Sequence, residues 1–459
     1  MPERLRSVGL DVGTTSTQMI LSELTVENRA SAFAVPEMEI ARREILYRSP
    51  VYFTPLLDEN RVDAARLREI ISAEYAAAGI QRESVDTGAI IITGETSRKE
   101  NAQAALEALS DFAGEFVVAT AGPDLESVLA AKGAGAPELS EKTGKPVLHM
   151  DIGGGTSNLA LIQEGKIVAT GCLNVGGRLL KFDENQRISY VSPVLDGITP
   201  LEVGDSMNQQ EVEKLARTLT AALETAAGKG EETALYHRLL TAETESIREK
   251  VPQDVIVSFS GGVADCIETV HDPMEFGDLG PLLGQAIRNS RLCGSRYALG
   301  AETIRATAIG AGCHSAQLSG STVFYRNVRF PMKNLPVVRL SAEEQHYPET
   351  KLTELIHTRL GKQEQTSVLA LPGLTAPGYG QVVSLAKAIT TGFGTNPVLV
   401  ALEQDMAKAL GQAMALRLPG GTPCLCIDRV RLEDESYLDV GAPVGPALPI
   451  VVKTLILSH

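Results

Sequence analysis

Met150-Asp151-Ile152-Gly153-Gly154-Gly155-Thr156-Ser157 (residues 150–157) ends an apolar run with an acid and three consecutive glycines. Glycine has no Cβ, so the backbone can turn tightly enough for consecutive N–H groups to point at one anion. The hydroxyl groups of Thr156 and Ser157 add further hydrogen-bond donors. The stretch therefore predicts half of a phosphate clamp at the end of a buried strand.

A second stretch near the N-terminus repeats this order, with Leu10-Asp11-Val12-Gly13-Thr14-Thr15-Ser16-Thr17. Because each copy follows a predicted strand, we expect two opposed clamps from two related halves of the chain. A third glycine turn, Ser260-Gly261-Gly262, follows the predicted strand 255–259. Its backbone could approach a ribose or an adenine with no side chain in between. Each turn alone is also compatible with an ordinary hairpin, but the three in this order are more specific.

The predicted ligand of these turns is ATP with Mg²⁺. The expected nucleotide-binding residues are Gly13, Thr14, Thr15, Ser16, Gly153, Gly154, Gly155, Thr156, Gly261 and Gly262. Asp11 and Asp151 would repel phosphate groups directly. We therefore expect them to hold Mg²⁺ through water, because this ion keeps several waters and takes only one or two carboxylates.

Glu95 is the candidate catalytic residue. It follows the predicted strand 89–94, where a carboxylate could orient the water that attacks a terminal phosphate. The alternative, an acid favoured by the dipole at a helix start, stays open. His149 is expected to be a satisfied core histidine, and Glu213 and Lys214 are expected on a solvated helix face rather than at a ribose.

Composition and charge limit the classes of function. Hydrophobic residues make up 44% and charged residues 22% of the 459, as in an ordinary globular protein. The net charge of −15 argues against broad binding to nucleic acid, although N–H groups and Mg²⁺ can still bind ATP. No apolar run approaches the roughly 20 residues that span a bilayer. We expect a cytoplasmic protein without membrane insertion or a leader, whose six cysteines are buried and reduced.

Hydrophobic periodicity divides the chain into three parts. Residues 1–145 and 146–320 repeat one order of strands, clamp and helices, and residues 321–459 alternate strands with helices as a separate α/β domain. The segment 132–146, rich in glycine, proline and lysine, is predicted to be an exposed crossing between the halves. Residues 174–178 are predicted to open a helix.

The ordered set of three turns resembles the two phosphate motifs and the adenosine motif of the actin, sugar kinase and DnaK-type ATPase superfamily. The resemblance covers roughly residues 5–320. It implies an α/β, actin-like ATPase fold of two related lobes, with ATP and Mg²⁺ in the cleft between them. It also implies two hinge segments that connect the lobes, for which 308–312 and 88–100 are the candidates.

The whole chain is similar to a narrower family, EutA, the reactivating factors of ethanolamine ammonia-lyase. The more family-specific residues lie in the tail, at 404–412, 439–444 and 448–455. Membership implies an ATP- and Mg²⁺-dependent chaperone that releases damaged cobalamin from the lyase, so that intact adenosylcobalamin replaces it. The family acts in ethanolamine utilisation, commonly with a bacterial microcompartment. A small-molecule (sugar-type) kinase and an actin-like scaffold protein are the alternatives on this fold, and a homo-oligomer stays open.

Overall fold

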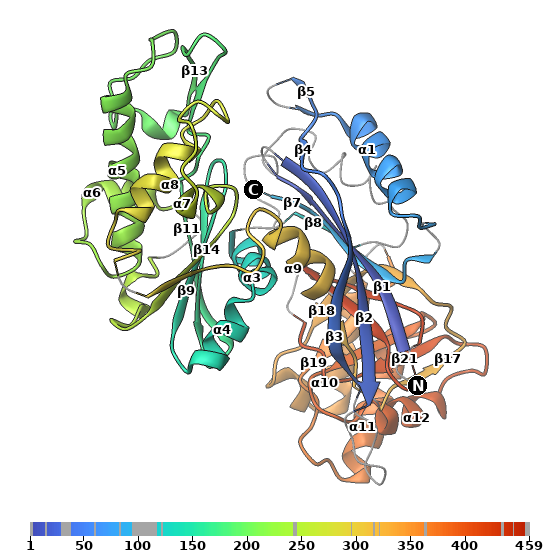
Figure 1. The fold of residues 1–459 in the computed structure, drawn as a ribbon. Coiled ribbons are helices and arrows are strands. Elements are labelled where there is room, and N and C mark those ends of the chain that lie inside the picture. The colour runs from blue at the N-terminus through green and yellow to red at the C-terminus, as the bar shows by residue number, and fades with distance from the viewer. Residues whose placement is uncertain are drawn as a thin grey trace.

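Three large sheets organise the described part of the chain (Figure 1). The computed structural model describes residues 3–13, 16–28, 38–58, 61–81, 84–93, 117–120, 123–241, 246–294, 296–314, 317–320, 322–361, 365–432, 436–443 and 445–454. None of the helices within these ranges is long and apolar enough to cross a membrane. All six cysteines are buried and none forms a disulfide.

The first sheet carries the N-terminal clamp. Its strands, in spatial order, are β3 (Met38–Arg48), β2 (Ser16–Asn28), β1 (Glu3–Val12), β7 (Thr87–Ile92) and β8 (Val117–Thr120), and β4 (Tyr52–Phe53) also pairs with β2. β1, β2 and β3 are antiparallel, whereas β7 and β8 continue the sheet in parallel from β1. α1 (Ala64–Ala77) covers one face, and its Leu67 and Ile71 belong to the same buried hydrophobic cluster as Leu10 of β1.

The second sheet carries the central clamp and has the same topology. Its spatial order is β11 (Lys166–Leu173), β10 (Ser157–Gln163), β9 (Val147–Ile152), β14 (Ile256–Ser260) and β15 (Tyr297–Leu299). Again three strands are antiparallel and two continue in parallel. This duplicated order confirms the predicted actin-like fold of two related lobes.

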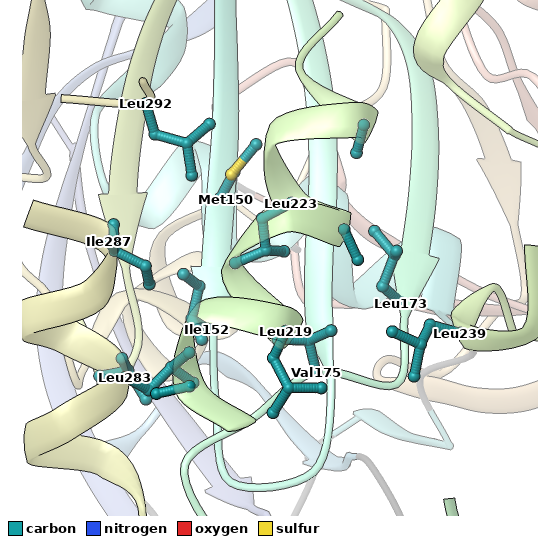
Figure 2. Close-up of a cluster of buried hydrophobic side chains, with 14 of the residues drawn as sticks. Met150, Ile152, Leu173, Val175, Leu219, Leu223, Leu239, Leu283, Ile287 and Leu292 are labelled. Carbon is teal, nitrogen blue, oxygen red and sulfur yellow. The ribbon is translucent and has the colours of Figure 1, made fainter. Parts of the chain in front are cut away.

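The core of the second lobe lies under α5 (Gln209–Ala226) and α8 (Gly280–Arg288). Figure 2 shows Leu219 and Leu223 of α5 among Met150 and Ile152 of β9 and Leu283 of α8. The buried residues of α5, which include Leu215, Leu219 and Leu223, recur with the period of one face of a helix. The shorter elements of the two lobes are β5 (Leu56–Asp58), β6 (Arg61–Val62), β12 (Leu180–Phe182), β13 (Ile188–Val191), α6 (Ala234–Leu239) and α7 (Asp265–Glu268).

The third sheet contains the C-terminal strands. Its order is β16 (Gln317–Leu318), β23 (Pro449–Thr454), β22 (Ser436–Val440), β18 (Met332–Arg339), β19 (Val368–Leu371), β20 (Val398–Leu402), β21 (Cys424–Ile427) and β17 (Phe324–Arg326). α10 (Glu349–Leu360), α11 (Tyr379–Phe393) and α12 (Ala407–Ala415) pack together over one face of this sheet. The predicted alternation of strands and helices is confirmed, while the domain boundaries at 145 and 320 stay a prediction.

In the described part of the chain, helices α3 and α9 lie between the two lobes (Figure 1). α3 (Pro123–Gly133) lies on β9, β10 and β11 of the second sheet, and α9 (Ala306–His314) lies on β1, β2 and β7 of the first. Where the helices cross, a Cβ at Gly133 would lie 1.8 Å from the carbonyl oxygen of Ala306. One at Gly310 would lie 2.0 Å from that of Leu129. Only glycine permits so close a crossing.

The structure corrects three predictions about connecting segments. Residues 308–312 lie in the connecting helix α9 as expected, but 88–92 lie inside β7, and 94–100 fall outside the described residues. Most of segment 132–146 is not an exposed crossing, because it contains α4 (Ala136–Thr143), whose flanking glycines take left-handed conformations that bound the helix. Residues 174–178 open no helix, since they form a turn that packs on the central clamp.

Candidate nucleotide site

A cavity of about 340 Å³ lies where the two clamps meet, with residues of both lobes in its wall. The predicted residues that line it are Asp11, Gly13, Ser16, Asp151, Gly153, Gly154, Gly155, Thr156, Gly261 and Gly262. Thr14, Thr15 and Glu95 lie outside the described residues. Residues up to 251 positions apart in the sequence are thus brought to one place, while their roles stay predictions.

The two clamps are closed by equivalent hydrogen bonds. The N–H of Gly13 donates to the carbonyl oxygen of Ser16 at 2.9 Å, and the N–H of Gly153 donates to that of Thr156 at 3.0 Å. Within the described part of the chain, no hydrogen bond uses the backbone N–H of Gly154, Gly155 or Thr156. Three successive N–H groups at the cavity wall form the kind of donor set that binds an anion.

The third turn packs directly on the end of β9. Gly261 has φ +85°, and a Cβ there would lie 2.3 Å from the carbonyl oxygen of Ile152. That same oxygen accepts a hydrogen bond of 3.2 Å from the N–H of Val263. Glycine at position 261 is therefore required by packing alone, beside any role in approaching a nucleotide.

Asp11 is buried at the end of β1 and faces the cavity. Burial raises the pKa of its carboxyl group to about 7. The hydrogen bond that Thr93 Oγ1 donates to Asp11 Oδ1, 2.9 Å long, opposes this rise in pKa, and the charge of Asp151 adds to it. The sequence does not indicate Thr93 as a site residue, because nothing local distinguishes a threonine that follows a strand.

Asp151 ends a buried hydrogen-bonded chain. Ser260 Oγ donates its proton to Asp151 Oδ1, so it accepts from Nε2–H of His149, 2.8 Å away. His149 Nδ1 then accepts from Ser258 Oγ at 2.8 Å, which assigns the histidine tautomer from the network. Burial lowers the pKa of His149 to about 3, so the ring is neutral at pH 7 and is a satisfied core histidine, as expected.

The two acids suit a divalent cation. Burial raises the pKa of Asp151 to about 6, although hydrogen bonds from Ser260 and Thr307 oppose the rise. Two buried carboxyl groups that line one cavity ionise reluctantly because each charge is desolvated and, for Asp11, repelled by the other. A cation such as Mg²⁺ prefers oxygen ligands and would favour the ionised form of both, so the residues present fit this ion.

The cavity wall contains an arginine, Arg178, that was not predicted from the sequence. Arg178 is the basic residue among the described residues of the wall, which also include five acids. Its N–H donates to the carbonyl oxygen of Gly154 at 2.7 Å, and its Nε pairs with Asp278 Oδ2 at 3.1 Å. The signal for this residue lies in the motif Asn174-Val175-Gly176-Gly177-Arg178, although the pattern by itself favours a helix start.

The cavity wall also contains an acid that the sequence does not indicate, Glu126, which lies half-buried on the connecting helix α3. An acid in the first turn of a helix has no sequence signature of a cavity residue, because the helix dipole favours acids there in any case. Glu213 lies away from the cavity and pairs with Arg217 at 3.6 Å on the outer face of α5, as expected.

Comparison with known proteins gives the following similarities. The family model of ethanolamine utilisation protein EutA matches residues 3–458. The ethanolamine ammonia-lyase reactivases EutA of Salmonella typhimurium and of Escherichia coli K12 are each 39% identical to this chain, over 98% of it and 98% of their own length. The solved structure of ethanolamine utilization protein EutJ from Carboxydothermus hydrogenoformans covers 68% of this chain and 89% of its own, at 16% identity and a TM-score of 0.34.

Proposed function

Since this chain belongs to the family of the ethanolamine utilisation protein EutA, we propose that it reactivates ethanolamine ammonia-lyase as an ATP- and Mg²⁺-dependent chaperone. The observation that carries the nucleotide part is the cavity in which the glycine clamps of both lobes meet. The identity of the partner rests on relatives that match nearly the whole chain. In this proposal the factor releases damaged cobalamin from the lyase, and intact adenosylcobalamin then takes its place.

The clamps would hold the nucleotide in three ways. The N–H groups of Gly154, Gly155 and Thr156 would donate to phosphate oxygens. Asp11 and Asp151 would hold Mg²⁺ through its waters, and the ion would supply positive charge to the phosphates. Gly261 and Gly262 would lie beside the adenosine, because neither residue carries a side chain of its own that could obstruct it.

ATP would drive the reactivation by favouring one arrangement of the lobes over another. A nucleotide that contacts clamps on both lobes binds the closed arrangement with more favourable free energy than an open one, and this difference is what shifts the population. Glu126 lines the cavity from a helix that connects the lobes, and in this proposal its carboxylate would orient water at the terminal phosphate. Glu95 stays a second candidate for that role.

The third sheet is in contact with the connecting helices. Val451 of β23 packs with Leu129 of α3 and Ala311 of α9, and with Ala89 and Ile91 of β7. A rotation of the lobes about these helices would therefore shift the C-terminal sheet as well. We place the surface that grips the lyase on this sheet and its helices, in a bacterial cytoplasm or an associated microcompartment.

The test is recovery of an ethanolamine ammonia-lyase that has been blocked with cyanocobalamin. The blocked enzyme is incubated with this protein, adenosylcobalamin, ATP and Mg²⁺, and ammonia release is followed. We expect recovery in the complete mixture and none when ATP or Mg²⁺ is omitted. Equal recovery with and without this protein would refute the proposal. ATP consumption stimulated by a small acceptor, without any lyase, would instead favour the kinase, and ATP-dependent sedimentation the scaffold.

A further inference from the structure

We propose that Arg178 binds the terminal phosphate of the nucleotide and so joins the two clamps across the cavity. This inference rests on the proposed nucleotide function and adds to it a residue that distinguishes a triphosphate from a diphosphate. Three observations support it: the backbone hydrogen bond of Arg178 to the central clamp, its contact with Phe53 beside the N-terminal clamp, and the charges around its side chain.

The backbone fixes Arg178 to the central clamp. Its N–H donates to the carbonyl oxygen of Gly154 at 2.7 Å, and the N–H of Gly177 donates to that of Gly153 at 2.9 Å. A Cβ at Gly176 would lie only 2.3 Å from the carbonyl oxygen of Gly154, so the two segments approach as closely as backbones can. The side chain of Arg178 therefore starts from a fixed point beside the free N–H groups of the clamp.

The side chain of Arg178 reaches the other lobe. Its guanidinium carbon lies 5.3 Å from the ring centroid of Phe53, within the range of a cation–π contact. Phe53 belongs to β4 and lies opposite Ser16 of the N-terminal clamp in the β2–β4 pair. Arg178 is thus placed between the two clamps, where the end of a polyphosphate held by both of them would lie.

The charge around Arg178 is suited to an exchange of partners. In this structure its Nε pairs with Asp278, and the two side chains are 24% and 10% exposed. Asp278 Oδ1 accepts a second hydrogen bond, 2.8 Å from the N–H of Gly280, which it would keep if Arg178 turned away. A phosphate carries more charge than a carboxylate and can accept two parallel guanidinium hydrogen bonds. It would therefore compete with Asp278 for Arg178.

The same arrangement of charges predicts that the cavity prefers the triphosphate to the diphosphate. The described wall contains five acids, Asp11, Glu126, Asp151, Asp265 and Asp278, against one arginine. An additional phosphate in such a wall is repelled unless a cation meets it. The N–H groups of the clamp can donate hydrogen bonds to a diphosphate. The added negative charge of a triphosphate would be neutralised by the guanidinium group of Arg178.

Affinities measured by calorimetry for two nucleotides test this inference. The probes are Mg²⁺ with ADP and Mg²⁺ with a non-hydrolysable ATP analogue, in the full chain. Arg178→Met should weaken binding of the ATP analogue roughly 10- to 100-fold, as expected for the loss of one or two charge-assisted hydrogen bonds. It should weaken binding of ADP less than about 3-fold. Arg178→Lys keeps the positive charge but lacks the planar guanidinium group, so its affinity for the ATP analogue should lie between those of the parent and Arg178→Met. Arg187→Met is the control: it removes an exposed arginine of the same lobe, and its affinities for both nucleotides should equal those of the parent.

A spectroscopic readout follows from the absence of tryptophan in this chain. Phe53→Trp creates a single indole beside Arg178, and tryptophan is the ring that a cation contacts best. Its emission should change with the triphosphate analogue more than with ADP, and Phe53→Trp combined with Arg178→Met should lose this difference.

The outcomes separate the two proposals. If the parent protein binds neither nucleotide, the nucleotide-dependent function itself fails. If the parent binds both but Arg178→Met and Arg178→Lys change neither affinity, or change both equally, only the assignment of Arg178 to the terminal phosphate fails.

Discussion

Thr93 donates a hydrogen bond of 2.9 Å to Asp11 across two parallel strands, and this bond only partly offsets the burial of the carboxyl group. The pKa of Asp11 is raised from 3.8 to about 7, first by burial and further by the charge of Asp151. In the proposed function, where Asp11 holds Mg²⁺ through water, the ionised form of this acid would stay destabilised until the cation binds. The buried Asp11 carboxyl group should therefore lower the free energy of unfolding of the protein when it ionises.

Asp11→Asn should stabilise the protein without nucleotide, and more so at higher pH. The folded parent holds the Asp11 proton up to about pH 7, whereas the unfolded chain releases it near pH 3.8. The folded state therefore binds more protons in this window, and parent stability falls as pH rises through it. Asparagine cannot ionise, so the difference between variant and parent should grow from pH 4 to pH 7 and then level off. Urea unfolding in the absence of Mg²⁺ measures this difference, and the exposed Asp254→Asn is the control. A stability difference between Asp11→Asn and the parent that is the same at every pH would contradict the raised pKa of Asp11.

Gly154→Asp should weaken binding of Mg²⁺-ATP by at least about tenfold, because it places a carboxylate beside the three free N–H groups of the clamp. Isothermal titration measures the affinity. Gly421→Asp is the matched control, since a Cβ there meets nothing within 4 Å and the position lies away from the cavity wall. Unchanged affinity in Gly154→Asp would remove the central clamp from the nucleotide site.

Glu126→Gln should slow ATP hydrolysis by roughly 100-fold while leaving ATP affinity within about 3-fold of the parent, because the amide cannot accept a proton from the attacking water. Phosphate release in single turnover gives the rate and titration gives the affinity. Glu138→Gln, in the first turn of the neighbouring helix α4, is the control. A full rate in Glu126→Gln would leave Glu95 as the candidate.

Gly133→Ala should destabilise the protein by about 3 kcal/mol, because the new methyl group would lie 1.8 Å from the carbonyl oxygen of Ala306 and force the connecting helices apart. Gly144→Ala adds the same methyl group where nothing lies within 4 Å, and its φ of +62° should cost only about 1 kcal/mol. Thermal and urea unfolding compare the two variants. If Gly133→Ala and Gly144→Ala lose the same amount of stability, the crossing of α3 and α9 tolerates a side chain.

The strands, the clamps and the duplicated order of the lobes could be predicted from the sequence. An apolar run that ends in an acid and several glycines is a local pattern, and its meaning depends on residues within about ten positions. Asp11 to Ser16 and Asp151 to Thr156 repeat that pattern. The repetition alone indicated two related lobes with facing turns.

The tertiary structure decided which side chains meet at the cavity. Thr93 reaches Asp11 over 82 positions, and Arg178 pairs with Asp278 over 100. No local signal marks such partners, because an arginine or a threonine after a turn looks the same in the sequence whether it faces solvent or a cavity. The same holds for the connecting helices, whose crossing depends on Gly133 and Gly310 meeting backbone from distant segments. Periodicity determines which residues form a strand or a helix, whereas long-range packing determines what each of them touches.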